Sequence, residues 1–232
     1  MNESLLALPF SRDARRRRLS RRAPPGPLRA LLESNWPPPR RPCHETEFLA
    51  LDMETTGLDP ARDAIVSLGW VRIEALAVRL DSATHRIVRP GSSIPEASAV
   101  IHRITDDMAA QGIDLTEALD ELFASLRGRV LLAHHARIER GFLRRACKEF
   151  YGLDLDVPVA DTLRLAQRRL ARQSSPPPAG ALRLDALRQR YNLPRYRAHN
   201  ALSDAIATSE LFIAQLSEKA PDGHVLLRDV LS

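Results

Sequence analysis

The stretch Phe48-Leu-Ala-Leu-Asp-Met-Glu-Thr-Thr-Gly57 is an apolar run that ends in two carboxylates. Its first residues predict a buried strand. Asp52 and Glu54 project from the same side of that strand, because side chains alternate along an extended chain. Acidic side chains are rare on buried strands unless they are paired or bound to a cation. A divalent cation would relieve the repulsion between these two carboxylates; the alternative is a strand-end pair that faces water.

The pattern on either side of this strand predicts an α/β fold. Residues 64–73 and 75–88 are two more expected strands, and alternating helices and strands follow, with strands at 130–133 and 157–160. We therefore expect a mixed five-stranded sheet, an antiparallel meander continued by parallel strands, flanked by helices. In such sheets functional groups collect at the carboxyl ends of strands, where Asp52, Glu54 and His135 all lie.

Composition narrows the class of protein. The chain has 232 residues, 44% of them hydrophobic, which is ordinary for a globular protein. No run approaches 18 apolar residues, so we expect no membrane span. Its first residues lack the order of a secretory signal, so we expect a cytoplasmic location. Cys43 and Cys147 are too few for a disulfide framework.

The positive charge is concentrated near the N-terminus. Residues 1–46 hold ten arginines and four acidic residues, whereas the whole chain has a net charge of +5, so the remainder is near neutral. We predict a basic, Pro- and Arg-rich extension at 1–46, a main domain at 47–218 and a tail at 219–232. The prolines of the extension are expected to exclude long helices. Its arginines can attract phosphate backbones, or they reflect a general preference for arginine over lysine.

A third carboxylate lies on a predicted helix over residues 136–150. Glu139, Phe142, Leu143 and Ala146 are spaced so that they share one helix face. Glu139 is therefore the single acid on an otherwise apolar stripe. Its two interpretations are a ligand directed at the same site as Asp52, and a side chain at the rim of the stripe that reaches solvent.

The final predicted long helix begins near residue 201 and carries a fourth carboxylate. Asp204 follows His199 by five residues, which would set them about 140° apart on a continuous helix. We place His199 in the loop before the helix, with Asn200 as its cap. His199 is then a candidate proton acceptor beside Asp204, although a histidine at the start of a helix is more often structural.

The three carboxylate-bearing motifs together resemble those of the DEDDh 3′-to-5′ exonucleases, the superfamily of the proofreading epsilon subunit of bacterial DNA polymerase III. The resemblance covers about residues 47–216. Its motifs read Phe48-Leu-Ala-Leu-Asp-Met-Glu-Thr-Thr-Gly-Leu58, Leu132-Ala-His-His-Ala-Arg-Ile-Glu-Arg-Gly-Phe-Leu143 and Tyr196-Arg-Ala-His-Asn-Ala-Leu-Ser-Asp-Ala205. Secondary markers are Val100-Ile-His-Arg-Ile-Thr105 and Val159-Ala-Asp-Thr-Leu163.

This resemblance implies a ribonuclease-H-like fold and two Mg²⁺ or Mn²⁺ ions. The implied metal ligands are Asp52, Glu54, Asp204 and Glu139, and the implied general base is His199. Asp161 would be structural, starting its helix. The residues that would contact the substrate are Thr55, Thr56, Gly57, Leu58, His102 and His135. The implied substrates are single-stranded DNA or RNA 3′ ends, and the implied partner is a DNA polymerase or another replication or repair protein.

The chain departs from the family pattern at three positions. Glu139 stands where the family usually has Asp, His135 where it often has Asn, and Arg103 where it has Gly. Glu139 matters most, because its side chain is longer by one C–C bond, about 1.5 Å, whereas metal–ligand distances hold to about 0.2 Å. We expect activity to survive. The competing interpretations are a non-catalytic nucleic-acid-binding or polymerase-associated domain and, among enzymes, an RNA-trimming exoribonuclease.

Overall fold

The computed structural model describes residues 9–91, 94–171, 178–196, 199–220 and 224–232, and its centre is a five-stranded sheet of order β3-β2-β1-β4-β5. β1, β2 and β3 form an antiparallel meander, and β4 and β5 continue it in parallel with β1. The predicted mixed sheet is thus confirmed. The strands are β1 (Phe48–Thr55), β2 (Ile65–Glu74), β3 (Ala77–Ile87), β4 (Val130–Ala133) and β5 (Val159–Asp161).

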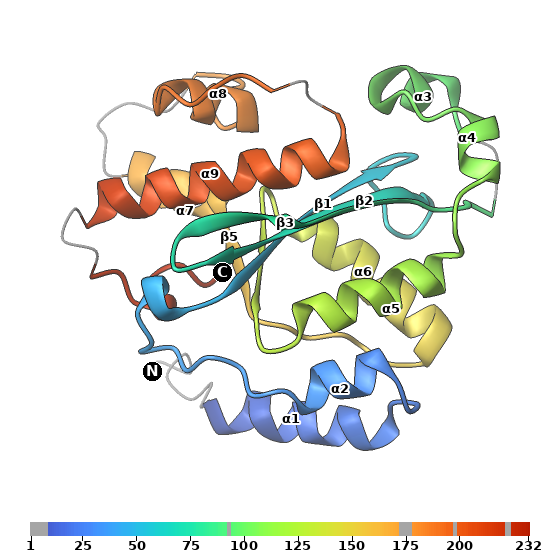
Figure 1. Cartoon of the computed structure of the whole chain (residues 1–232), viewed down its shortest axis with the longest axis horizontal. Helices are drawn as coiled ribbons and strands as arrows, with labels where there is room; N and C mark the ends of the chain where they lie inside the picture. The colour runs from blue at the N-terminus through green and yellow to red at the C-terminus, as the bar shows by residue number, and fades with distance from the viewer. Residues whose placement is uncertain (1–8, 92–93, 172–177, 197–198, 221–223) are drawn as a thin grey trace, which may run out of the picture.

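Helices cover both faces of the sheet (Figure 1). α9 lies along one face, with α7 and α8 beside it, and α5 and α6 lie along the other face, with α1 and α2 beyond α5. The helices are α1 (Pro9–Arg22), α2 (Pro27–Glu33), α3 (Glu96–His102), α4 (Asp106–Ala110), α5 (Leu115–Leu126), α6 (Arg137–Tyr151), α7 (Thr162–Leu170), α8 (Leu184–Arg190) and α9 (Ala201–Lys219).

The alternation of β1 decides which layer receives the carboxylates. Phe48 and Ala50 pack in the core under α9, whereas Leu49 and Leu51 pack in the core under α5 and α6. Because side chains alternate, Asp52 and Glu54 belong to the face that α9 covers. The strand continues through Thr55, beyond the apolar run that predicted it, because β2 pairs with it along this length.

The N-terminal segment contradicts the expectation that prolines exclude long helices from residues 1–46. α1 has 14 residues and ends at Arg22, before the first proline of the proline-rich run. α2 has Pro27 in its first turn, where a missing N–H costs nothing. Leu28, Leu31 and Leu32 of α2 are buried in the same core as β1, so this segment packs against the sheet domain.

The C-terminal segment is tied to the same body. Val225, Leu227 and Val230 are buried in the core under α9. The backbone of residues 39–43 pairs with residues 225–228, through hydrogen bonds that include Cys43 N to Val225 O (2.8 Å) and Leu227 N to Arg41 O (2.9 Å). The two flanks of the sheet domain are therefore joined to each other.

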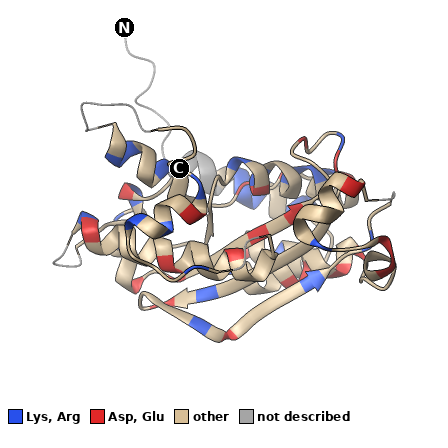
Figure 2. Ribbon diagram, turned by 90° about the horizontal axis from the view of Figure 1, so that it is seen from above, with Lys and Arg blue, Asp and Glu red and all other residues tan. Residues whose placement is uncertain are grey.

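Charged residues of both signs are interspersed over the side of the molecule seen in Figure 2, as the near-neutral charge beyond residue 46 predicts. Part of the basic excess is used inside the fold. Arg15 on α1 forms ion pairs with Asp154 (2.7 Å) and Asp156 (3.1 Å). Within the described residues, no helix is both long and apolar enough to cross a membrane.

Candidate active site

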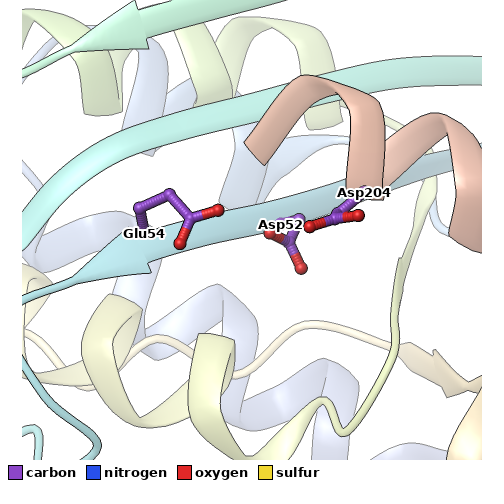
Figure 3. A group of neighbouring side chains, drawn as sticks. All are labelled: Asp52, Glu54 and Asp204. Atoms are coloured by element: carbon purple, nitrogen blue, oxygen red, sulfur yellow. The ribbon is translucent and has the colours of Figure 1, made fainter. Parts of the chain in front are cut away.

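Three of the predicted carboxylates converge on one point. Asp52 and Glu54 from β1 and Asp204 from α9 have ligand oxygens that all lie within 4.8 Å of one another. Figure 3 shows the strand and the helix presenting these carboxylates toward each other. Their spacing and hard oxygen atoms suit divalent cations such as Mg²⁺ or Mn²⁺.

The electrostatics of this group favour a bound cation. Burial, followed by the charges of Glu139, Asp204 and Glu54, raises the pKa of Asp52 well above its ordinary value. Burial and the charge of Asp204 raise the pKa of Glu54 to about 7. Burial also raises the pKa of Asp204. Each carboxylate is thus difficult to ionise beside the others, and a cation would offset both the repulsion and the loss of hydration.

Gly69 brings the helix and the strand together. It pairs with Asp52 across β1 and β2. A Cβ atom at this position would lie 2.1 Å from the backbone nitrogen of Leu202 in the first turn of α9. The first turn therefore rests directly on the β2 backbone, and this close approach sets Asp204 beside Asp52. Sequence reasoning missed Gly69, although a glycine inside a strand is a known signal of close backbone approach.

Glu139 lies close to Asp52 but outside the group of three. It projects from the first turn of α6, is 4% exposed, and its Oε2 atom has no hydrogen-bond partner among the described residues. Burial raises its pKa to about 8, its own backbone amide opposes the shift, and the charge of Asp161 adds to it. A buried oxygen without a partner is costly, so an additional ligand such as a cation or its water would stabilise this arrangement.

His199 lies in the loop before α9, where the sequence placed it. Its backbone amide donates to Asp204 Oδ2 at 2.8 Å, and its φ of 64° is left-handed. Asn200 caps the helix by accepting from the amide of Ser203. The His199 side chain is exposed beside the carboxylates, so the loop fixes its backbone while leaving the imidazole accessible to solvent.

Asp161 organises the neighbouring strand ends. Its carboxylate accepts from the amides of His135 (3.0 Å) and Ala136 (3.1 Å) and also caps α7. The expected structural role at the start of a helix is thus observed, together with a second link that sequence reasoning missed. His135 is exposed with a left-handed φ of 67°, a strain that the two hydrogen bonds help to hold.

The turn after β1 presents the other predicted substrate-contacting residues. Asp63 braces this turn by accepting from the amide of Asp59 (2.8 Å) and from the Thr56 hydroxyl (3.4 Å). A Cβ atom on Gly57 would meet the Asp63 carboxylate at 2.5 Å, so any other residue here would displace the side chain that braces the turn. Leu58 is 75% exposed at the tip of the turn, as an apolar contact for a ligand would require.

His102 is buried at the end of α3, and the protein uses both of its ring nitrogens. The amide of Ile104 donates to Nδ1 at 3.1 Å, so Nε2 carries the proton and donates to the Ser98 hydroxyl at 2.9 Å. Ser98 in turn donates to the carbonyl of Thr55. His102 therefore supports the end of β1 from behind, and burial followed by the nearby His199 lowers its pKa.

A cavity of about 1000 Å³ opens beside the carboxylates between α8, the loop that follows it and α9. Its lining includes His135, His199 and Asp204 as well as Arg183, Arg195 and Tyr196. His134 closes one wall. Its Nε2 donates to the carbonyl of Leu182 (3.1 Å), its Nδ1 accepts from the Thr162 hydroxyl (2.8 Å), and burial lowers its pKa to about 4.

The part of the chain that carries the carboxylates of β1, α6 and α9 matches a known protein family. An exonuclease family model matches residues 49–212. This chain belongs to that exonuclease family. The match includes every motif quoted above apart from the first residue of the first motif, and the resemblance read from the sequence is thereby confirmed.

The relatives of this exonuclease domain include PolC-type DNA polymerase III and DNA polymerase III subunit epsilon. The chain is 33% identical over 169 residues to the PolC-type DNA polymerase III of Thermotoga maritima, a match that covers 73% of this chain and 12% of that protein. It is 30% identical to the DNA polymerase III subunit epsilon of Treponema pallidum, covering 76% of this chain and 80% of that protein. The chain thus spans a small part of the PolC-type relatives and most of the epsilon subunit.

Solved structures confirm the ribonuclease-H-like exonuclease fold. Exonuclease X, in complex with 5′ overhanging duplex DNA, superposes with a TM-score of 0.58 at 23% identity. The superposition covers 75% of this chain and 93% of that one. At this identity the likeness concerns the fold.

Proposed function

We propose that this chain is a metal-dependent 3′-to-5′ exonuclease that releases nucleoside 5′-monophosphates from nucleic-acid 3′ ends. The convergence of Asp52, Glu54 and Asp204 within 4.8 Å, beside an exposed His199, is the observation that carries the proposal. Membership of the exonuclease family supports nuclease activity in general. The polarity and the roles of individual residues are our inference.

Each residue has a distinct part in the proposed reaction. The three converging carboxylates, with Glu139 behind them, would hold two Mg²⁺ or Mn²⁺ ions. Such ions lower the pKa of a bound water and stabilise charge on the leaving 3′-oxygen. His199 would accept the proton of the attacking water, a role for which its imidazole is accessible beside the carboxylates.

The turn at residues 55–58 would border the 3′-terminal nucleotide. Leu58 offers an apolar surface at its tip, and exposed His135 faces the cavity on the other side of the carboxylates. His102 would contribute indirectly, because both of its ring nitrogens are already bonded within the protein. Its role is to hold Thr55 through Ser98.

The named relatives favour DNA as the substrate and a DNA polymerase as the partner. RNA trimming is the second candidate among enzymes. The sequence contains no evident reader of the 2′-hydroxyl, so it does not choose between DNA and RNA. A non-catalytic nucleic-acid-binding domain is the candidate from another class, and Glu139 in place of the usual Asp favours it. Release of mononucleotides would distinguish the two enzyme candidates from the non-catalytic binding domain.

The test is hydrolysis of matched single-stranded DNA and RNA, each labelled at the 5′ end or at the 3′ end. A 3′-to-5′ exonuclease yields a descending ladder from the 5′ label and mononucleotide from the 3′ label, in Mg²⁺ or Mn²⁺ and not in EDTA. Asp52→Asn should abolish release, and it should raise the melting temperature of the metal-free protein because it removes one of three crowded charges.

Asp81→Asn is the matched control, because Asp81 is an exposed acid on β3 away from the site. Release from an internal position, or release by Asp52→Asn at the wild-type rate in a nuclease-free preparation, would contradict the proposal. Binding without any mononucleotide release would establish the non-catalytic alternative.

A further inference from the structure

Tyr196 is an aromatic side chain at the cavity beside the carboxylates that the proposed reaction leaves unused. It lies three residues before His199, and both line the cavity between α8 and α9. Tyr196 is 43% exposed, although its ring and hydroxyl both have partners within the protein. The partners lie on one side of it and come from α8 and α9.

Arg188 of α8 supports the ring from one face. Its guanidinium carbon lies 4.6 Å from the centroid of the Tyr196 ring. Arg188 is itself 4% exposed and immobilised, since it donates to the carbonyls of Ala207 (2.6 Å) and Pro194 (2.7 Å) and to Glu210 (2.7 Å). A buried guanidinium held by three hydrogen bonds is a rigid support for an aromatic face.

The hydroxyl fixes the edge of the same ring. Tyr196 Oη donates to Glu210 Oε1 at 2.7 Å, and Glu210 also accepts from Arg188. The ring is therefore held by one face and by its edge, and its remaining exposure belongs to the other face and rim. Such a preorganised surface loses little conformational entropy when a planar group stacks on it.

The position of the exposed face of the Tyr196 ring indicates which planar group could stack on it. Figure 1 shows α3 and the turn after β1 on one side of the first turn of α9, and α8 on the other side. If the 3′-terminal nucleotide lies at the turn after β1, the strand passes the carboxylates and continues toward α8. Arg183 and Arg195 line the cavity, and their guanidinium groups make no hydrogen bond or ion pair with the described residues, so they are available to phosphates.

We propose that Tyr196 is the stacking surface for a base on the 5′ side of the scissile phosphate. The proposal rests on the proposed exonuclease function and specifies how the strand is bound. Stacking of a base on an aromatic ring tolerates every base, because each has a π face. It would therefore contribute affinity for single-stranded ends without sequence preference.

The test compares substrates that have or lack an upstream base. The p-nitrophenyl ester of thymidine 5′-monophosphate carries a terminal nucleotide but has nitrophenol in place of the upstream strand. Tyr196→Ser should lower kcat/KM for a single-stranded oligonucleotide by about 5- to 150-fold relative to that for the ester. Tyr196→Phe, which keeps the ring, should retain most of the oligonucleotide activity. An abasic residue 5′ to the scissile phosphate should reduce wild-type activity and make Tyr196→Ser no worse.

Fluorescence separates this proposal from the catalytic one. An oligonucleotide with 2-aminopurine 5′ to the last phosphate, mixed with the full chain in EDTA, should be quenched by the wild type and by Tyr196→Phe but not by Tyr196→Ser. Quenching without hydrolysis would uphold the stack and overturn the exonuclease assignment. Three results would overturn the stacking proposal. They are an equal fall in kcat/KM of Tyr196→Ser for the ester and for the oligonucleotide, unchanged quenching by Tyr196→Ser, and no binding of the oligonucleotide by the wild type.

Discussion

The backbone amide of His199 donates a 2.8 Å hydrogen bond to the carboxylate of Asp204. The candidate base is thereby tied through its main chain to a candidate metal ligand, five residues further along. The imidazole takes no part in this bond. Changing the His199 side chain therefore leaves the support of Asp204 intact, so the chemical and structural roles of this loop can be separated.

His199→Ala should slow the chemical step by about 10²- to 10⁴-fold, the usual contribution of a positioned general base. Mn²⁺-induced stabilisation should change little, because the amide that supports Asp204 remains. Single-turnover rates near neutral pH and melting curves with and without Mn²⁺ measure the two effects. His44→Ala, an exposed histidine before β1, is the control. An unchanged rate would assign the base to another group.

Glu139→Ala should lose most activity, and Glu139→Asp should also be impaired although it restores the usual family residue. The shorter side chain withdraws its oxygens by about 1.5 Å. The buried Phe142 and Leu143 hold α6 in place and prevent it from closing that gap. Single-turnover rates across a Mn²⁺ titration compare the three proteins, with the isosteric Glu139→Gln as a test of charge alone.

The rim interpretation of the sequence is wrong, because Glu139 is buried (4% exposed) and does not reach solvent. A fully active Glu139→Ala would show that this buried residue is not a ligand either. A Glu139→Asp variant faster than the wild type would mean that Glu139 weakens the site, and it would favour a binding role for the domain.

Gly69→Ala should damage the site more than the fold. The added Cβ would lie 2.1 Å from Leu202 N, so the first turn of α9 must move away from β2 and take Asp204 with it. Overpacking of this kind costs about 1–3 kcal/mol of stability, whereas misplacing a catalytic group by about 1 Å can cost 10²-fold in rate. The free energy of unfolding and kcat/KM are measured together. Gly91→Ala, where a Cβ meets open space, is the control; equal rates in both variants would refute the positioning role.

His134 should make the protein sensitive to acid. Its pKa is about 4 in the folded protein and near 6.5 when unfolded, so the unfolded chain binds more protons between these values. The free energy of unfolding therefore falls as pH drops from about 6.5 to about 4. Glutamine in His134→Gln keeps a hydrogen-bond donor and an acceptor but does not titrate. Between pH 7 and pH 4.5 the free energy of unfolding of this variant should therefore fall by about 2–3 kcal/mol less than that of the wild type. Urea denaturation at the two pH values measures this difference. An equal fall in the free energy of unfolding of the wild type and of His134→Gln would contradict a lowered pKa for His134.

Two strands at the centre of the sheet were predictable because they begin with short, continuous apolar runs. The run at residues 48–51 and the strand at residues 130–133 are buried on both faces, and their continuous apolar pattern marks them without any knowledge of neighbours. The 14-residue α1 was missed because its surroundings are rich in arginine and proline. α1 packs on α2, the next helix in the chain, and α2 packs on α5, which is distant in sequence, so no local pattern records the contact that holds this segment to the domain.

The sequence predicted those site residues whose side chains can themselves bind a metal ion or transfer a proton. Asp52, Glu54 and Asp204 were identified as acids in unusual settings, and the structure brings them together. Gly69, Ser98 and Arg188 were missed because their importance comes from what they touch. In the sequence, a glycine that makes room for a helix or an arginine that supports a ring looks the same as any other glycine or arginine.

The pairing of residues 39–43 with residues 225–228 has a topological consequence. It closes the chain between Cys43 and Val225 into a loop whose ends are joined by backbone hydrogen bonds and not by a covalent bond. Because the entropy of closing so long a loop grows only with the logarithm of its length, a few such bonds and the buried Val225 and Leu227 can maintain it. Trimming either flank would therefore remove the hydrogen-bond partners of the other flank's backbone.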